Sequence, residues 1–161
     1  ETRSPAAALE SFAGIGRRFE RRGEVAGVLV IDDYGHHPTE IRAVLRTARE
    51  RFPGRRLWAV FQPHTYSRTK ALLAEFAAAF DDADEAVILE IYPSRETDTL
   101  GICSEDMRRL MRRRPYAADN PAEAATLLAG AVQPGDVVLT IGAGDVTTVG
   151  PRLLRLLESR V

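Results

Sequence analysis

Residues 25–41 read VAGVLVIDDYGHHPTEI, and this stretch decides the fold class. The apolar run at 25–31 is continuous rather than alternating, which is typical of a strand that is buried on both faces of a parallel sheet. A polar segment follows at 32–37, and Pro38 then opens a stretch with helical spacing. In open α/β sheets, ligands bind where a parallel strand ends and the next helix begins. The stretch therefore predicts both an α/β fold and the place of a binding site.

The same design recurs along the chain. Four apolar runs indicate buried strands and one polar stretch indicates an edge strand, namely 25–31, 57–61, 86–91, 136–141 and, for the edge, 18–24. Six stretches indicate helices, namely 5–12, 38–52, 67–80, 104–114, 121–131 and 145–158. Ser104 and Asp145 are the expected N-caps of the fourth and sixth helices. Because strands that alternate with helices form right-handed βαβ units, we expect one α/β domain with a mostly parallel, Rossmann-like sheet. Helices should cover both faces, with one antiparallel edge strand.

The composition is that of an ordinary globular domain. The chain has 161 residues, 45% hydrophobic and 28% charged, and its net charge of −1 gives no basic field for nucleic acid. The single cysteine, Cys103, excludes an intrachain disulfide and favours a reducing compartment. We find neither a signal peptide nor an apolar run of roughly 18 residues. We therefore expect a cytoplasmic location and no membrane or nucleic-acid partner. The first residue is Glu1 rather than Met, which suggests an excised or processed piece.

A glycine turn follows the last expected strand. Gly142-Ala143-Gly144 resembles the start of a G-x-G-x-x-G phosphate turn, but the third glycine would fall on Thr147. We therefore expect a tight strand-to-helix turn. No G-x-x-x-x-G-K-[ST] segment occurs anywhere, so the chain has no P-loop and cannot hydrolyse ATP by the usual P-loop route. The polar stretch 93–101 is long enough for a functional loop.

The polar residues after the first two buried strands are the candidate binding groups. Of Asp32 and Asp33, one is expected to accept hydrogen bonds in a turn, and the other is a candidate acceptor for ribose hydroxyls. His36 and His37 are adjacent and point to opposite sides, so we expect no metal site there; one should be buried and the other should face the crevice. Structural and ligand-binding roles for this pair remain equally open. Arg68 opens a helix, where its charge is unfavourable, and its planar fork suits a carboxylate or phosphate.

Three segments together resemble the carboxy-terminal domain of the Mur ligase family, in particular of its L-alanine-adding members. They are GIGRRF at 14–19, DDYGHHPTEI at 32–41 and FQPHTYSRT at 61–69. Residues 79–101 are similar to the strand and variable loop of the family, and 142–144 to its last strand turn. The family often continues this turn with Asn-Ile-Gly, where the chain has Asp-Val-Thr at 145–147.

The resemblance implies one domain of a three-domain ligase. Residues 1–16 would be the tail of the central domain and the hinge, and residues 17–161 the carboxy-terminal domain, which closes over the substrates. The family reaction activates the lactyl carboxylate of UDP-N-acetylmuramate with ATP as an acyl phosphate, and the amine of L-alanine attacks it. ATP and Mg²⁺ would be bound mainly by the missing central domain. The isolated chain is therefore expected to be inactive.

The resemblance also assigns residues to the nucleotide. Arg18 would be the hinge arginine that reaches the ATP phosphates. Asp33 would hold the ribose, with Tyr34 beside it. It implies neither a catalytic residue nor a metal ligand in this chain.

A second set of residues is assigned to the incoming amino acid. His36 and Arg68 would lie near the carboxylate of L-alanine, with His64 in the same loop. Some family members have a further arginine where this chain has Thr65, so recognition would depend more heavily on Arg68 here.

Two alternatives remain. The related ligase that recycles murein tripeptide usually has Phe-Ala where this chain has Tyr34-Gly35. A stand-alone α/β module that binds a nucleotide or peptide without catalysis is the alternative from another class. A P-loop encoded upstream would favour a ligase, and an immediate start codon would favour the module.

Overall fold

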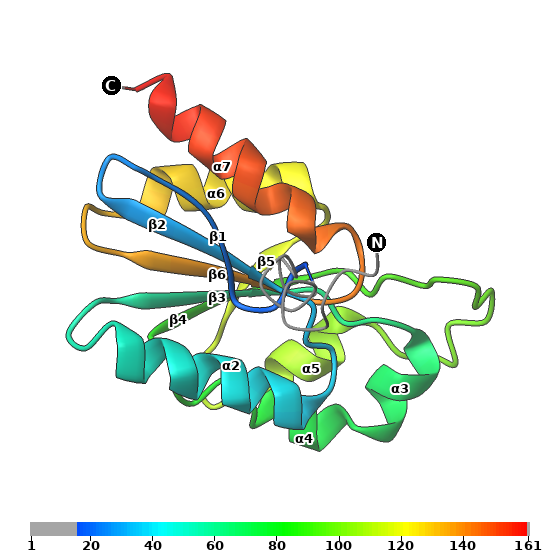
Figure 1. The fold of residues 1–161 in the computed structure, drawn as a ribbon. Helices are drawn as coiled ribbons and strands as arrows, with labels where there is room; N and C mark the ends of the chain where they lie inside the picture. The colour runs from blue at the N-terminus through cyan, green and yellow to red at the C-terminus, as the bar shows by residue number, and fades with distance from the viewer. Residues whose placement is uncertain (1–15, 161) are drawn as a thin grey trace, which may run out of the picture.

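A single twisted sheet organises the computed structural model, which describes residues 16–160 (Figure 1). The strand order is β1-β2-β6-β3-β4-β5. The strands are β1 Glu20–Val25, β2 Val28–Asp33, β3 Leu57–Phe61, β4 Glu85–Leu89, β5 Tyr116–Ala118 and β6 Val137–Ile141. β1 pairs with β2 antiparallel, and every other pair is parallel. The predicted sheet, with its one antiparallel edge strand, is confirmed.

Helices cover both faces of the sheet, as predicted. They are α2 Pro38–Arg51, α3 Tyr66–Ala71, α4 Leu73–Ala77, α5 Ser104–Leu110, α6 Pro121–Ala131 and α7 Val149–Glu158, with a short 3₁₀ helix η1 at Asp145–Thr148 before the last. Figure 1 shows α6 and α7 on one side and α2 to α5 on the other. Each side has its own apolar core, because the strands β2, β3, β4 and β6 are buried on both faces. The expected helix at 5–12 lies outside the described residues. No helix within 16–160 is long and apolar enough to cross a membrane.

The apolar run at 25–31 is not one strand. Val25 ends β1, and Val28 begins β2, with a two-residue hairpin turn between them. Ala26 and Gly27 have φ angles of 52° and 75°. Two-residue hairpin turns require positive φ at their central residues because this matches the twist of the paired strands. Apolar composition alone does not reveal such a turn.

Two predicted helices are shorter than expected. The stretch 67–80 is interrupted at Leu72, whose φ of −117° and ψ of 25° are not helical, so the chain forms α3 and α4 instead. Phe76 and Phe80 are nevertheless buried, as predicted. The stretch 104–114 ends at Leu110, because Met111 adopts an extended conformation that leads to β5, a strand the pattern did not predict.

Two helix starts also differ. Cys103, not Ser104, precedes the first turn of α5, and its N–H donates to the Asp106 carboxylate (2.9 Å). Ser104 is the first helical residue, and its hydroxyl donates to Glu90. Asp145 opens η1 without a side-chain cap, and α7 follows it.

The amino ends of β3 and β6 are joined by a buried carboxylate. Asp136 accepts hydrogen bonds from Arg56 Nη2 (2.7 Å), from Trp58 Nε1 (3.0 Å) and from the N–H of Gln133 (2.9 Å). Burial alone would raise the pKa of Asp136, but these donors hold it below its ordinary value. Trp58 is itself buried, so this end of the sheet is well packed.

The carboxyl ends of β2, β6 and β3 form the switch point of the sheet. β6 lies between β2 and β3. The chain leaves β2 and β3 toward the side of α2 and α3, whereas it leaves β6 toward α7 on the other side (Figure 1). In open α/β sheets, ligands bind outside the strand ends at the point where neighbouring loops diverge in this way.

Candidate functional site

The loops after β3 and β6 pack closely at this switch point. The side-chain Oε1 of Gln62, the first residue after β3, accepts a hydrogen bond from the N–H of Val146 (3.1 Å). A Cβ on Gly144 would lie 2.5 Å from that oxygen, and one on Gly142 would lie 3.0 Å from the Gln62 carbonyl oxygen. Gly142 also has a φ of 144°. Packing and backbone conformation therefore explain the glycines, in agreement with the prediction of a tight turn.

Asp33 is buried at the end of β2 and accepts two backbone hydrogen bonds. Its Oδ2 accepts from the N–H of Phe19 (2.8 Å), and its Oδ1 from the N–H of Gly35 (2.7 Å). The carboxylate thus holds the chain before β1 against the turn after β2. The ribose contact stays a prediction, and the structure adds this anchoring role to it.

Asp32 is also buried and ties three segments together. Its carboxylate accepts from Arg17 Nε (2.9 Å) and from the hydroxyls of Thr147 (2.9 Å) and Thr140 (2.6 Å). Arg17 also donates to the carbonyl oxygen of Gly142 (2.6 Å). The sequence offered Asp32 as one of two candidates for a structural acceptor, but nothing local indicated that Arg17 would be its partner.

Arg18 and Tyr34 face outward beside this network. The Arg18 side chain is 51% exposed, and its Nη1 lies 3.9 Å from Glu40 Oε1, which is a weak surface contact. Tyr34 is 39% exposed, and the Arg17 guanidinium lies over its ring, 5.0 Å from the centroid. Both predicted nucleotide-binding side chains are therefore accessible to solvent beside the switch point.

The two adjacent histidines have different roles, but neither is buried, so this part of the prediction is wrong. His37 is exposed and caps α2, because its Nδ1 accepts from the N–H of Thr39 (3.2 Å). His36 is half-buried, and its ring lies near that of His64. Glu40 accepts from the N–H groups of both histidines (2.8 and 3.1 Å). Burial alone would raise the pKa of Glu40, but these N–H groups hold it below its ordinary value.

The structure brings His36, His64 and Arg68 together. The two imidazole rings are 6.2 Å apart between centroids, and Arg68 Nη1 lies 3.5 Å from His64 Nδ1. His64 stacks on Tyr92, with 5.6 Å between centroids and 18° between planes. Burial lowers the pKa of His64, and the charges of Arg68 and His36 lower it further, whereas Glu96 opposes them. His64 is therefore a neutral imidazole at pH 7.

The electrostatics of this cluster leave one cation available. No ion pair among residues 16–160 involves Arg68. Its guanidinium can only donate, so its 3.5 Å contact with His64 Nδ1 favours the tautomer of His64 that carries the proton on Nε2. The cluster thus offers a guanidinium fork and an imidazole N–H, both of which suit a carboxylate.

Sequence reasoning missed two residues of the segment after β4. Tyr92 stacks on His64, and Glu96 accepts from the N–H groups of Tyr66 and Ser67 at the start of α3. One signal was available: α3 has no acidic residue in its first turn, so an acceptor for its N–H groups had to come from elsewhere. The sequence at the start of α3 does not indicate which distant acid accepts hydrogen bonds from these N–H groups.

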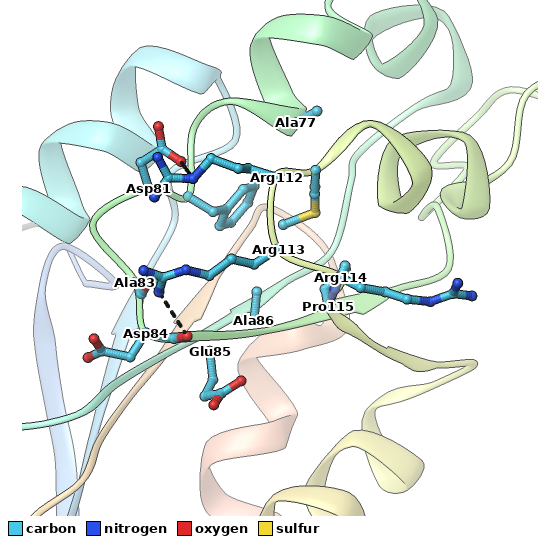
Figure 2. A pocket seen from close by; sticks show the side chains of 12 residues that line it. Ala77, Asp81, Ala83, Asp84, Glu85, Ala86, Arg112, Arg113, Arg114 and Pro115 are labelled. Carbon is cyan, nitrogen blue, oxygen red and sulfur yellow. Dashed lines mark hydrogen bonds and ion pairs between the residues drawn. The ribbon is translucent and has the colours of Figure 1, made fainter.

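A well-formed hollow of about 310 Å³ lies elsewhere, at the amino end of β4. Figure 2 shows it, with Arg112 directed at Asp81 and Arg113 at the backbone of Asp84. It contains none of the predicted site residues. No group of three or more His, Cys, Asp or Glu side chains in the described part of the chain could hold a metal ion.

Comparison with known proteins gives one family. Its sequence model, described as Mur ligase, glutamate ligase domain, matches residues 17–144. UDP-N-acetylmuramate–L-alanine ligases from Anaeromyxobacter dehalogenans and Solidesulfovibrio magneticus are 50% and 48% identical to the chain, over 94% and 92% of it. The chain spans only 33% and 34% of their length, about a third of these curated relatives.

Two solved structures share the fold over 96% of the chain. One is a UDP-N-acetylmuramate–alanine ligase from Thermotoga maritima, with 31% identity and a TM-score of 0.75. The other is a murein peptide ligase from Psychrobacter arcticus, with 27% identity and a TM-score of 0.78. The chain covers 33% and 32% of those two proteins.

Proposed function

The chain belongs to the Mur ligase family, and we propose on that basis that it is the carboxy-terminal domain of an ATP-dependent ligase that joins L-alanine to UDP-N-acetylmuramate. The identity of 50% to a ligase of that name, over 94% of the chain, supports this substrate pair. In the proposed reaction, ATP converts the lactyl carboxylate of the sugar into an acyl phosphate. The amine of L-alanine then attacks the acyl carbon and displaces phosphate.

The observation that carries the proposal is the guanidinium of Arg68, which lies beside His64 and His36 and has no ion-pair partner among residues 16–160. A carboxylate can accept two parallel hydrogen bonds from the arginine fork. The Nε2–H of neutral His64 supplies a further donor. This cluster would hold the carboxylate of L-alanine and so orient its amine. The attack of the amine is faster when both reactants are fixed in one geometry.

The nucleotide would lie beside Arg18 and Tyr34, away from the cluster around Arg68. The side chains of Arg18 and Tyr34 are accessible, and Asp33 holds the backbone N–H groups of the residues that follow them, Phe19 and Gly35. The residues present fit a contact to phosphate and to ribose, but not the whole cofactor, since the chain has no P-loop. Mg²⁺, which neutralises charge on the phosphates, would be held by the preceding domains. Residues 1–16 would then be the tail of the central domain and the hinge.

The geometry around Gly35 favours the L-alanine ligase over the recycling ligase. A Cβ on Gly35 would lie 3.0 Å from Asp33 Oδ1 and 3.3 Å from the Cβ of Glu40, closer than ordinary contact. The alanine usual in the recycling ligase would therefore push against the carboxylate that anchors this turn. The TM-score of 0.78 to a murein peptide ligase keeps that activity as the second candidate.

The test is phosphate release from ATP by the full-length protein and by the 161-residue chain, in a cytoplasmic-type reducing buffer. With UDP-N-acetylmuramate and L-alanine, we expect turnover from the full-length protein and none from the chain. Robust turnover by the chain alone would contradict the domain assignment. Turnover of the full-length protein with murein tripeptide, but not with L-alanine, would identify the recycling ligase. Absence of turnover with either would favour a non-catalytic binding module.

A further inference from the structure

We propose that Glu96 is a positioning residue that fixes the first turn of α3 and thereby holds Arg68 and His64 in the arrangement that receives the substrate carboxylate. The identity of that carboxylate rests on the proposed function. The anchoring itself rests on contacts in this chain alone.

The segment after β4 is tied to the segment after β3 before the loop begins. The N–H of Tyr92 donates to the carbonyl oxygen of Pro63, and the N–H of Thr65 donates to that of Tyr92, both at 2.8 Å. These bonds form a parallel bridge between His64 and Tyr92. The bridge holds the two rings in their stacked arrangement, so His64 is fixed from the loop side.

α3 needs an anchor because its own start is weak. It has only six residues, too few to be stable by themselves, and the side chain of its N-cap residue, Thr65, forms no capping hydrogen bond. Thr65, at the N-cap position, has a φ of 69°. For a β-branched residue this conformation is strained, and such strain persists only where surrounding contacts impose it.

Glu96 holds the first turn of α3 through hydrogen bonds, although it is thirty residues from Tyr66 in the sequence. Its Oε2 accepts from the N–H of Tyr66 (2.6 Å) and from that of Ser67 (3.0 Å), and its Oε1 accepts from the Ser67 hydroxyl. The Ser67 hydroxyl and these N–H groups lower the pKa of Glu96, so it is a carboxylate at every pH near neutrality. A negative charge at the amino end of a helix is also favourable toward the helix dipole.

This arrangement orders Arg68 without neutralising it. Arg68 follows Ser67 directly, so the anchored turn sets where its side chain starts. The Glu96 carboxylate is engaged by three donors of the α3 start and forms no ion pair with Arg68 within the described residues. At the far end of α3, Lys70 Nζ donates to the carbonyl oxygen of Leu100 (2.8 Å), so the loop holds both ends of the helix.

The test compares Glu96→Gln with Asp98→Asn in the full-length enzyme. Glutamine keeps the shape but turns one acceptor oxygen into an NH₂ group that faces donors. Misplacing Arg68 should raise the KM for L-alanine on the order of 10- to 100-fold, with the KM for ATP unchanged. Asp98→Asn removes the same charge from the same loop. Within the described residues Asp98 accepts a hydrogen bond only from the N–H of Leu100, so the KM of this variant for L-alanine should match that of the wild type.

A second readout separates this proposal from the proposed function. In the 161-residue chain, Glu96→Gln should accelerate amide hydrogen exchange at Tyr66 and Ser67, and Asp98→Asn should not. Faster exchange with an unchanged KM for L-alanine would show that Glu96 anchors α3 without positioning Arg68, and would overturn the proposal. Unchanged exchange would overturn it as well. If the wild-type enzyme does not use L-alanine at all, the proposed function fails, while the exchange result still decides whether Glu96 anchors α3.

Discussion

Replacing Arg68 by lysine tests the candidate carboxylate site most directly. Arg68 is partly buried, lies 3.5 Å from His64 and has no carboxylate partner in the described chain, so a bound carboxylate would be its first charged partner. Lysine keeps the charge but loses the fork and its two parallel bonds. A bidentate charged pair in a closed crevice is worth about 2–4 kcal/mol, which corresponds to roughly 30- to 1000-fold in kcat/KM for L-alanine.

The assay is steady-state phosphate release by the full-length enzyme, with one substrate varied at a time. The loss should appear chiefly in the KM for L-alanine, because ATP does not carry that carboxylate. Arg109→Lys is the matched control, since Arg109 is 71% exposed and pairs with Glu105 on the surface. Its substitution should cost less than about 1 kcal/mol. An unchanged KM for L-alanine in Arg68→Lys would remove Arg68 from the site and leave His36 and His64 as the remaining donors.

Three further predictions concern Asp33, Asp136 and Gly144. Asp33→Asn replaces an acceptor oxygen by an NH₂ group that meets a backbone N–H, so urea unfolding should show a loss on the order of 1–3 kcal/mol; a raised KM for ATP without such a loss would point to the ribose contact instead. The folded pKa of Asp136 is depressed, so its carboxylate stabilises the fold above the unfolded pKa of about 3.9, and this contribution is lost as the pH falls through the lower folded pKa. The stability difference between wild type and Asp136→Asn should therefore be constant above about pH 5 and shrink in acid; a difference that grows in acid would refute the assignment. Gly144→Ala should destabilise by about 1–3 kcal/mol because its Cβ would meet Gln62 and the Tyr92 ring, whereas Gly130→Ala, inside α6 with open space around it, should stabilise by about 0.4–1 kcal/mol in thermal unfolding.

Periodicity located the elements whose burial follows a regular pattern along the chain. The strand at 57–61 matches β3 at both ends, and the helix predicted from Pro38 ends one residue from its expected position. In both, the apolar pattern and the Pro or Gly at the boundary act together. It failed where backbone conformation, rather than burial, decides the outcome. The hairpin turn at Ala26 and Gly27 is hidden within an apolar run, and β5 has too few buried residues to show a pattern.

In the candidate site, too, local sequence patterns predicted some features and not others. Strand ends rich in His, Asp and Arg indicated which loops would meet, and His36, His64 and Arg68 do lie together. The groups that hold them are distant in sequence. Glu96 is thirty residues from Tyr66, and Arg17 is 125 residues from Gly142, so no local pattern relates them. Such pairings become visible only once the sheet order brings the loops together.

The buried contact between Trp58 and Asp136 makes this chain easy to monitor. Trp58 is the only tryptophan, so all indole emission comes from one position. Its Nε1 donates to a carboxylate at the amino end of β3, whereas the candidate site lies beyond the other end of that strand. The emission of Trp58 should therefore shift to longer wavelength on global unfolding and should not change when a nucleotide or amino acid binds at the candidate site. A single optical signal can thus measure the stability of each variant in the presence of ligand, without interference from binding itself.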